Sequence, residues 1–211
     1  MNDKKVALVG EQITASLGPV AMSINGPDRA EINDFKGQSQ ARRLPDGRIE
    51  IAVQGSPHRG KRNEAQVLKV LASAVSLERG TSVVVNPPTP EDDARGIDGT
   101  TVARDGAKLV VQIVSVPVDR KYARCVAQGQ HHVILTMNEA IGWVHDAIRH
   151  KSGIAPADRR SMILALDLRH AGLLAAEDFV EAYRHQIRPA DLGFAEVWLV
   201  ANVPTHSARI A

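Results

Sequence analysis

The sequence has almost no cysteine, few aromatic residues and no long apolar run. A single cysteine, Cys125, in 211 residues excludes an intramolecular disulfide and a cysteine-rich zinc cluster. No segment approaches the ~18 consecutive apolar residues that a membrane-spanning helix needs. The apolar stretch near the N-terminus is also too short for a secretory signal. We therefore expect a cytoplasmic protein with no membrane partner.

Net charge is also small, because 26 Lys and Arg face 24 Asp and Glu, which gives a formal net charge of +2. This balance neither requires nor excludes a polyanionic partner such as DNA. Aromatic residues make up 3% of the chain and hydrophobic residues 44%, so the core must consist mainly of Ala, Val, Leu and Ile. A chain of this length can bury one core, and a single domain is expected.

Residues 1–55 are predicted to form a β-rich N-terminal layer of that domain. The segment 48–54 alternates polar and apolar residues, as a half-buried strand does. Turn sequences containing Pro, Asp and Gly, such as 44–47, separate the short apolar pieces.

Residues 56–211 are predicted to form an α/β (α+β) core with a mixed central β-sheet flanked by helices. A helix begins near residue 62, because Glu64, Leu68, Leu71 and Val75 form one helical stripe, and Gly80 ends it. Further along the chain, a capping box at 136–139 opens a second helix, and a third is expected at 177–185. The apolar segments 162–166 and 195–203 are predicted strands, and the tail after residue 204 is expected to be loose.

The segment 96–114 is predicted to be a hairpin with its turn at 105–106. If Gly106 is the left-handed residue of a three-residue loop, Ala103 pairs with Ala107 and Asp98 lies opposite Gln112. Gln112 interrupts an apolar strand, and a buried amide without partners costs roughly 1–3 kcal/mol. Either neighbouring backbone satisfies this amide or the amide binds something.

The helix acid, the acid that begins the hairpin and the polar residue on the facing strand together resemble the PD-(D/E)XK (restriction-endonuclease-like) nuclease superfamily, over about residues 60–200. The resemblance implies a restriction-endonuclease-like core and a hydrolase in which Asp98 and Gln112 bind Mg²⁺ while Glu64 assists. Hydrolysis of DNA phosphodiester bonds would follow from a metal-activated water. The stretch 163–172 also looks like a segment of uncharacterised bacterial proteins that are placed near this superfamily.

One residue departs from the pattern, because Val114 occupies the position where the superfamily has a Lys. Valine neither positions a water nor stabilises an anion. Lys69 lies about 140° around the helix from Glu64, and Lys108 lies at the turn end of its strand. Neither replaces the missing group convincingly, so the motif is degenerate.

Two functions therefore stay open: a metal-dependent endonuclease, and a non-catalytic module on the same fold that binds nucleic acid or a protein partner, with a homodimer also open. Each candidate residue has a structural explanation too. Asp98 lies in a turn sequence and can cap it, Gln112 can be a satisfied core amide, and Glu64 suits the N-terminus of a helix.

A basic run precedes the predicted helix, and Arg59, Lys61 and Arg62 are its candidates for contacts with backbone phosphates. A solvated loop explains the same run. The sequence contains no dinucleotide-binding, P-loop or nucleophile-elbow motif.

Overall fold

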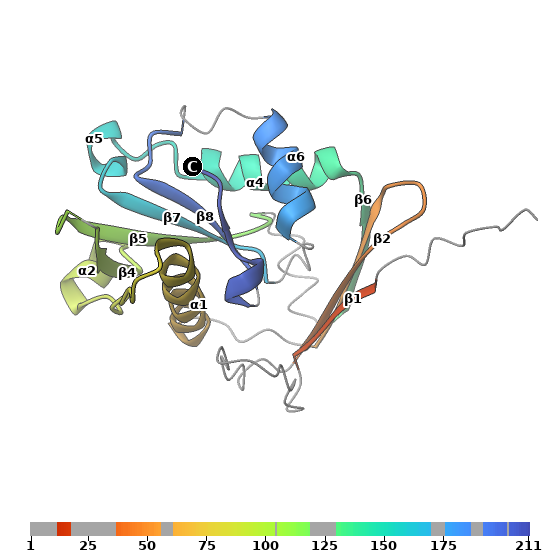
Figure 1. Ribbon diagram of the computed structural model, residues 1–211, viewed down its shortest axis with the longest axis horizontal. Helices are drawn as coiled ribbons and strands as arrows, with labels where there is room; N and C mark the ends of the chain where they lie inside the picture. The colour runs from red at the N-terminus through yellow and green to blue at the C-terminus, as the bar shows by residue number, and fades with distance from the viewer. Residues whose placement is uncertain are drawn as a thin grey trace, which may run out of the picture.

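The computed structural model describes residues 12–17, 37–55, 61–103, 105–118, 130–169, 176–186, 192–201 and 203–211. They form two β-sheets, one of five strands in the order β4-β5-β7-β8-β9 and one of four strands in the order β1-β2-β3-β6 (Figure 1). No helix of this described part is both long and apolar enough to cross a membrane.

The five-stranded sheet is mixed and carries most of the fold. Its strands are β4 (Gly99–Val102), β5 (Lys108–Ser115), β7 (Met162–Asp167), β8 (Glu196–Val200) and β9 (Ala208–Arg209). Strands β5, β7 and β8 run parallel, and β4 and β9 pair antiparallel at the two edges. Helix α4 lies between β5 and β7 in sequence and α6 between β7 and β8, as parallel pairing requires.

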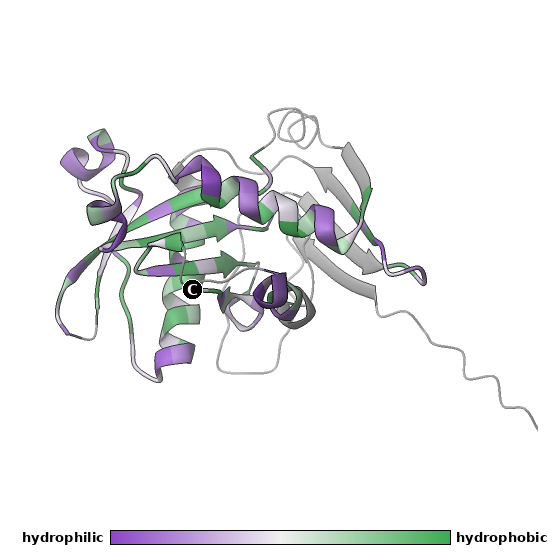
Figure 2. Ribbon diagram, turned by 90° about the horizontal axis from the view of Figure 1, so that it is seen from above, coloured by the Kyte–Doolittle hydropathy of each residue, from purple (hydrophilic) through white to green (hydrophobic). Residues whose placement is uncertain are grey.

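Helices cover both faces of this sheet. Helix α1 (Lys61–Arg79) lies on one face, whereas α4 (Met137–His150) and α6 (Ala176–Gln186) lie on the other (Figures 1 and 2). The short helices are α2 (Pro90–Ala94), α5 (Pro156–Arg159) and the 3-10 turn η2 (Pro204–His206). Strand β7 is buried along its whole length because helices cover both of its faces. A mixed sheet flanked by helices is the predicted α/β (α+β) fold class.

Helix α1 has the apolar stripe that the sequence predicts. Leu68, Leu71 and Val75 are buried against the sheet, whereas Glu64, at the head of the stripe, is only partly buried. Gly80 follows the last helical residue with a φ of +64°, a left-handed conformation that favours glycine at a helix end.

The β4–β5 hairpin has the predicted register. The Ala103 N–H donates to the carbonyl of Ala107 at 2.8 Å, and Gly99 pairs with Val111. Gly106, with a φ of +85°, is the left-handed residue of the turn. Asp98 lies just before β4, where its N–H donates to the carbonyl of Val111 at 3.0 Å, so the predicted pairing of Asp98 with Gln112 falls beyond the regular ladder.

The capping box of α4 is also confirmed. The Thr136 side chain accepts from the Glu139 N–H, and the Glu139 carboxylate accepts from the Thr136 N–H. These two side chains therefore satisfy two backbone N–H groups at the start of the helix. The buried residues of α4 include Ile141, Val144 and Ile148, which are the predicted core positions.

The second sheet is antiparallel and consists of β1 (Gln12–Leu17), β2 (Gly37–Arg43), β3 (Ile49–Gly55) and β6 (Gln130–Leu135). Strand β3 confirms the strand predicted from the alternation at 48–54. Strand β6, however, comes from outside residues 1–55, where the β-rich layer was expected. Ile49, Ile51 and Leu135 belong to the same apolar core as Val144 and Leu164. The β-rich N-terminal segment is thus joined to the α/β part by one core.

The prediction of a loose C-terminal tail is wrong. Residues 204–206 form η2, and β9 pairs with β8 at the sheet edge. Ile210 is 2% exposed, and its N–H donates to the carbonyl of Val197. The short tail contained too few apolar residues to predict a strand, and the neighbouring strand supplies the hydrogen-bond partners that hold it.

Candidate functional site

Gln112 lies on the α4 side of the five-stranded sheet, next to Asp98. Along β5, Val111 belongs to the core under α1, and Val114 belongs to the core under α4 and α6. Because side chains alternate along a strand, Gln112 shares its face with Val114. Asp98 lies next to it, because the Asp98 carboxylate accepts the N–H of the following residue, Ile113.

The Asp98 carboxylate continues the hydrogen-bond ladder where β4 begins. Its Oδ2 accepts the Ile113 N–H at 2.7 Å. The N–H of Val110 donates to the carbonyl of Ser161, just before β7. Because successive N–H groups along a strand point to opposite sides, the N–H of Ile113, three residues later, points toward β4. The first residue of β4 is Gly99, and the side chain of Asp98 therefore takes the place of a missing strand carbonyl.

Gln112 makes the reciprocal contact. Its Nε2 donates to the carbonyl of Gly96 at 2.7 Å, because a carbonyl only accepts. The side chain is 8% exposed, and within the described part of the chain its Oε1 is buried without a hydrogen-bond partner. Together the two side chains fasten residues 96–98 to β5, and we call this arrangement the 98–112 clasp.

Burial raises the pKa of the Asp98 carboxyl, while the Ile113 N–H lowers it. Two charges also act on it, since Lys151 lowers the pKa and Asp93 raises it. Lys151 is the C-cap residue of α4. It is a cation near Asp98 that the sequence gave no reason to select, because it is distant in the chain.

Glu64 lies across the sheet from the clasp. A Cβ built on Gly99 would lie 3.0 Å from a methyl group of Leu68, so α1 passes β4 on the face opposite Gln112. Glu64 is one helical turn before Leu68. The structure thus places Asp98 next to Gln112 and puts the helix that carries Glu64 on the face opposite Gln112.

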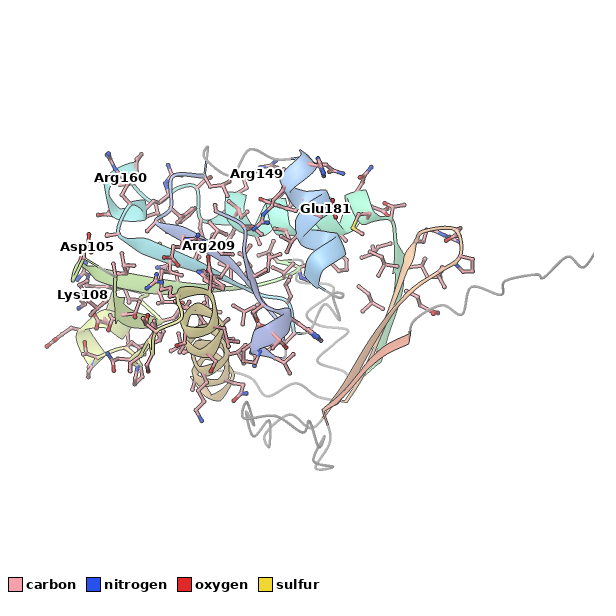
Figure 3. The ribbon with its side chains drawn as sticks, viewed as in Figure 1. Asp105, Lys108, Arg149, Arg160, Glu181 and Arg209 are labelled. Atoms are coloured by element: carbon pink, nitrogen blue, oxygen red, sulfur yellow. The ribbon has the colours of Figure 1, made fainter. Side chains whose placement is uncertain are left out.

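Val114, at the position where the superfamily has Lys, is buried in the core. Val114 is 5% exposed and packs in the α4-side core. Lys69 is exposed on α1, and Lys108 is exposed near Asp105 at the turn end of the hairpin (Figure 3). Neither lies at the clasp.

The basic candidates are placed only in part. Arg59 lies outside the described residues, and Lys61 and Arg62 form the start of α1, with side chains outside the description.

A metal would find few ligands at the clasp. Among the described residues, no three or more His, Cys, Asp or Glu side chains form a group able to hold a metal ion. Asp98 and the orphan Gln112 Oε1 offer one carboxylate and one amide oxygen, which suits only a hard cation that keeps several waters. The protein would therefore supply two ligands to Mg²⁺, the Asp98 carboxylate and the Gln112 amide oxygen.

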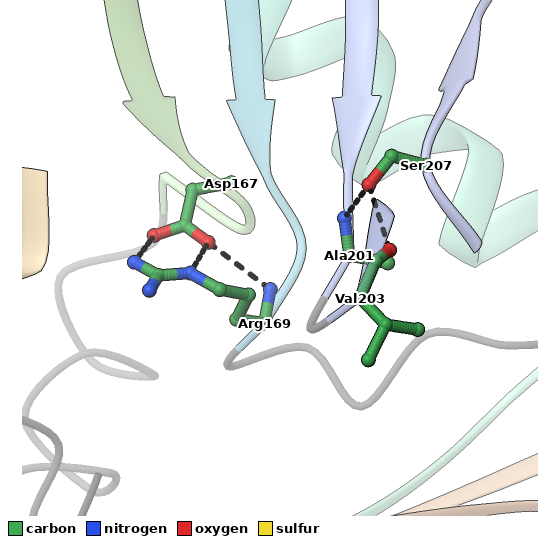
Figure 4. Close-up of polar contacts among 5 residues, drawn as sticks. All are labelled: Asp167, Arg169, Ala201, Val203 and Ser207. Atoms are coloured by element: carbon green, nitrogen blue, oxygen red, sulfur yellow. Dashed lines mark hydrogen bonds and ion pairs between the residues drawn. The ribbon is translucent and has the colours of Figure 1, made fainter. Parts of the chain in front are cut away.

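A second polar pair, which the sequence alone did not point to, lies at the carboxyl end of β7. Asp167 is 0% and Arg169 6% exposed, and the Arg169 Nε and Nη2 donate to the two carboxylate oxygens at 2.8 and 2.9 Å (Figure 4). Asp167 follows Ile163 and Ala165 on the α1 face. The sequence feature that could have indicated this pair is an acid at the end of an apolar strand, with an Arg two residues later.

Comparison with protein-family models, with curated proteins and with solved structures finds no match for this chain. The likeness to the PD-(D/E)XK superfamily rests on Glu64, Asp98 and Gln112 alone.

Proposed function

We propose that this protein is a non-catalytic binding module on an α/β fold and that its partner is a nucleic acid. The 98–112 clasp carries this proposal. Asp98 and Gln112 each bind backbone of the opposite segment, at 2.7 Å in both cases. Because these contacts stabilise the hairpin, they explain why polar groups persist in an apolar strand without requiring catalysis.

The choice of nucleic acid is supported by the start of α1. Lys61 and Arg62 are its first residues, and Arg59 precedes it in the sequence. The N–H groups and the positive end of the helix dipole favour anions at this end, and basic side chains add to that preference. A phosphate backbone is the anion that a module of this kind would bind without reading sequence.

A second candidate function is Mg²⁺-dependent phosphodiester hydrolysis, favoured by the buried Gln112 Oε1 that has no partner in the described structure. Asp98 and Gln112 would hold the ion, which when bound would lower the pKa of a water and offset charge on a phosphate. Against it stand the buried Val114 and the position of Glu64 across the sheet.

Binding can be tested by fluorescence anisotropy with single- and double-stranded DNA at several salt concentrations. The variant R59Q/K61Q/R62Q is expected to bind more weakly and to lower the salt slope, by about one per lost phosphate contact. A matched control, R95Q/K108Q/R160Q, removes the same charge from exposed sites elsewhere and should change binding less. No DNA binding by the native protein, or equal losses in both variants, would contradict the proposed partner.

Hydrolysis is tested separately with plasmid and single-stranded DNA in Mg²⁺ or Mn²⁺. We expect no cleavage. Cleavage by the native protein that is lost in D98A would establish the second candidate instead. Cleavage that persists in D98A would indicate a contaminating nuclease.

A further inference from the structure

A cavity of about 630 Å³ lies between α6 and the C-terminal segment, away from the 98–112 clasp. Its volume lies within the range of roughly 300–1,000 Å³ typical of small-molecule sites. The α6 wall includes Val180, Glu181, Arg184 and His185, which recur with helical spacing on one side of the helix. The facing wall belongs to the segment 205–208, which was expected to be loose and instead ends in β9.

Arg184 reaches from α6 to the C-terminal segment beside this cavity. Its Nη2 donates to the carbonyl of Arg209 at 2.8 Å, which links α6 to β9. In the described part of the chain Arg184 makes no ion pair. A guanidinium has five N–H donors, so one bond to a carbonyl leaves most of them for a ligand.

The remaining wall residues give the cavity a mixed character. Among the described residues that line the cavity, Glu181 is the one acid, and its carboxylate lies 3.9 Å from the His185 side chain. Val180 and Ala208 add apolar surface, and Thr205 adds an exposed hydroxyl. Arg184 is therefore the charged residue of this lining that makes no ion pair in the described part of the chain, whereas Glu181 lies beside His185.

We propose that this cavity binds a small organic anion, with a carboxylate or phosphate group on Arg184 and an apolar body against Val180 and Ala208. Arg pairs with such groups through two parallel N–H bonds, which gives a planar anion a defined orientation. The proposal is independent of DNA binding, because none of its residues belongs to the start of α1.

The test uses three probes in isothermal titration and ligand-observed NMR: 4-methylpentanoate, phenyl phosphate and the neutral 4-methylpentanamide. At least one of the two anions is expected to bind at millimolar concentration or below, and the amide more weakly. R184Q should weaken anion binding about tenfold, since it removes a charged hydrogen-bonding partner. E181Q should strengthen it, because it removes a carboxylate from the cavity wall. R160Q, an exposed variant on another element, should leave it unchanged (Figure 3).

Several outcomes would overturn the proposal. One is no binding of either anion at about 10 mM, and another is equal binding of the acid and its amide. If R184Q reduces anion affinity no more than R160Q does, Arg184 does not bind the anion. Weaker anion binding in E181Q would show that the acid does not repel the ligand, contrary to the charge argument. Arg184 and Glu181 are exposed, so equal thermal unfolding of these variants and the native protein checks their fold.

Discussion

The two polar pairs of the five-stranded sheet differ in what they join. The 98–112 clasp links each side chain to backbone across the hairpin, and its amide leaves Oε1 without a partner in the described structure. The Asp167–Arg169 pair joins two opposite charges at the end of a fully buried strand. Because a buried charge depends on its partner far more than a neutral amide does, we expect the second pair to matter more for stability.

The strongest test of this comparison is R169M. It leaves the Asp167 carboxylate, which is 0% exposed, without its bidentate partner. The free energy of unfolding should fall by about 3–5 kcal/mol, as for other broken buried pairs. Urea unfolding followed by the fluorescence of Trp143 and Trp198 measures it. The variant D167L/R169M removes both charges and should lose less than R169M alone; a larger loss would show that the pair does more than neutralise itself.

A smaller effect is expected from D98A, which removes the acceptor of the Ile113 N–H. The loss should be about 0.5–1.5 kcal/mol, the net value of an ordinary hydrogen bond. Hydrogen exchange gives a local readout, because the Ile113 amide should exchange faster while those of β7 stay protected. If Ile113 exchange does not change, the clasp does not hold the hairpin end.

Q112L should change stability least, by less than about 1 kcal/mol. It deletes one bond to Gly96 but also removes a buried oxygen that has no partner in the described structure, and these effects oppose each other. Urea unfolding beside D98A measures both halves of the clasp. A loss above about 2 kcal/mol would indicate that Gln112 Oε1 has an essential partner, such as a bound ion or water.

The pH dependence separates Asp98 from the other carboxylates. Burial raises its pKa above 3.8 in the folded state, so the folded protein takes up this proton more readily than the unfolded chain. Its contribution to stability is therefore fully present below pH 3.8 and is lost as pH rises through the raised pKa. The free energy of unfolding of the native protein, relative to that of D98N, should rise as the pH falls from 7 to 4, by less than about 1.4 kcal/mol per pH unit. A constant difference would contradict the raised pKa.

The fold class and most elements were predictable because they depend on local patterns. The stripe of Leu68, Leu71 and Val75, the capping box of α4 and the glycine of the 105–106 turn each act within a few residues. The hairpin register followed from the turn alone, and it pairs Gly99 with Val111. Strand β9 was missed because its partners lie in β8 rather than in its own neighbourhood.

The sequence by itself determined the helices α1, α4 and α6, the strands β3, β5, β7 and β8, and the register of the β4–β5 hairpin, because periodicity and turn chemistry are local. The tertiary structure alone decided which face of the sheet each polar group occupies. It placed Glu64 opposite the clasp, brought Lys151 to Asp98 and buried the Asp167–Arg169 pair. These outcomes depend on which helix covers which face, and that choice is made by burial of apolar surface summed over the whole sheet.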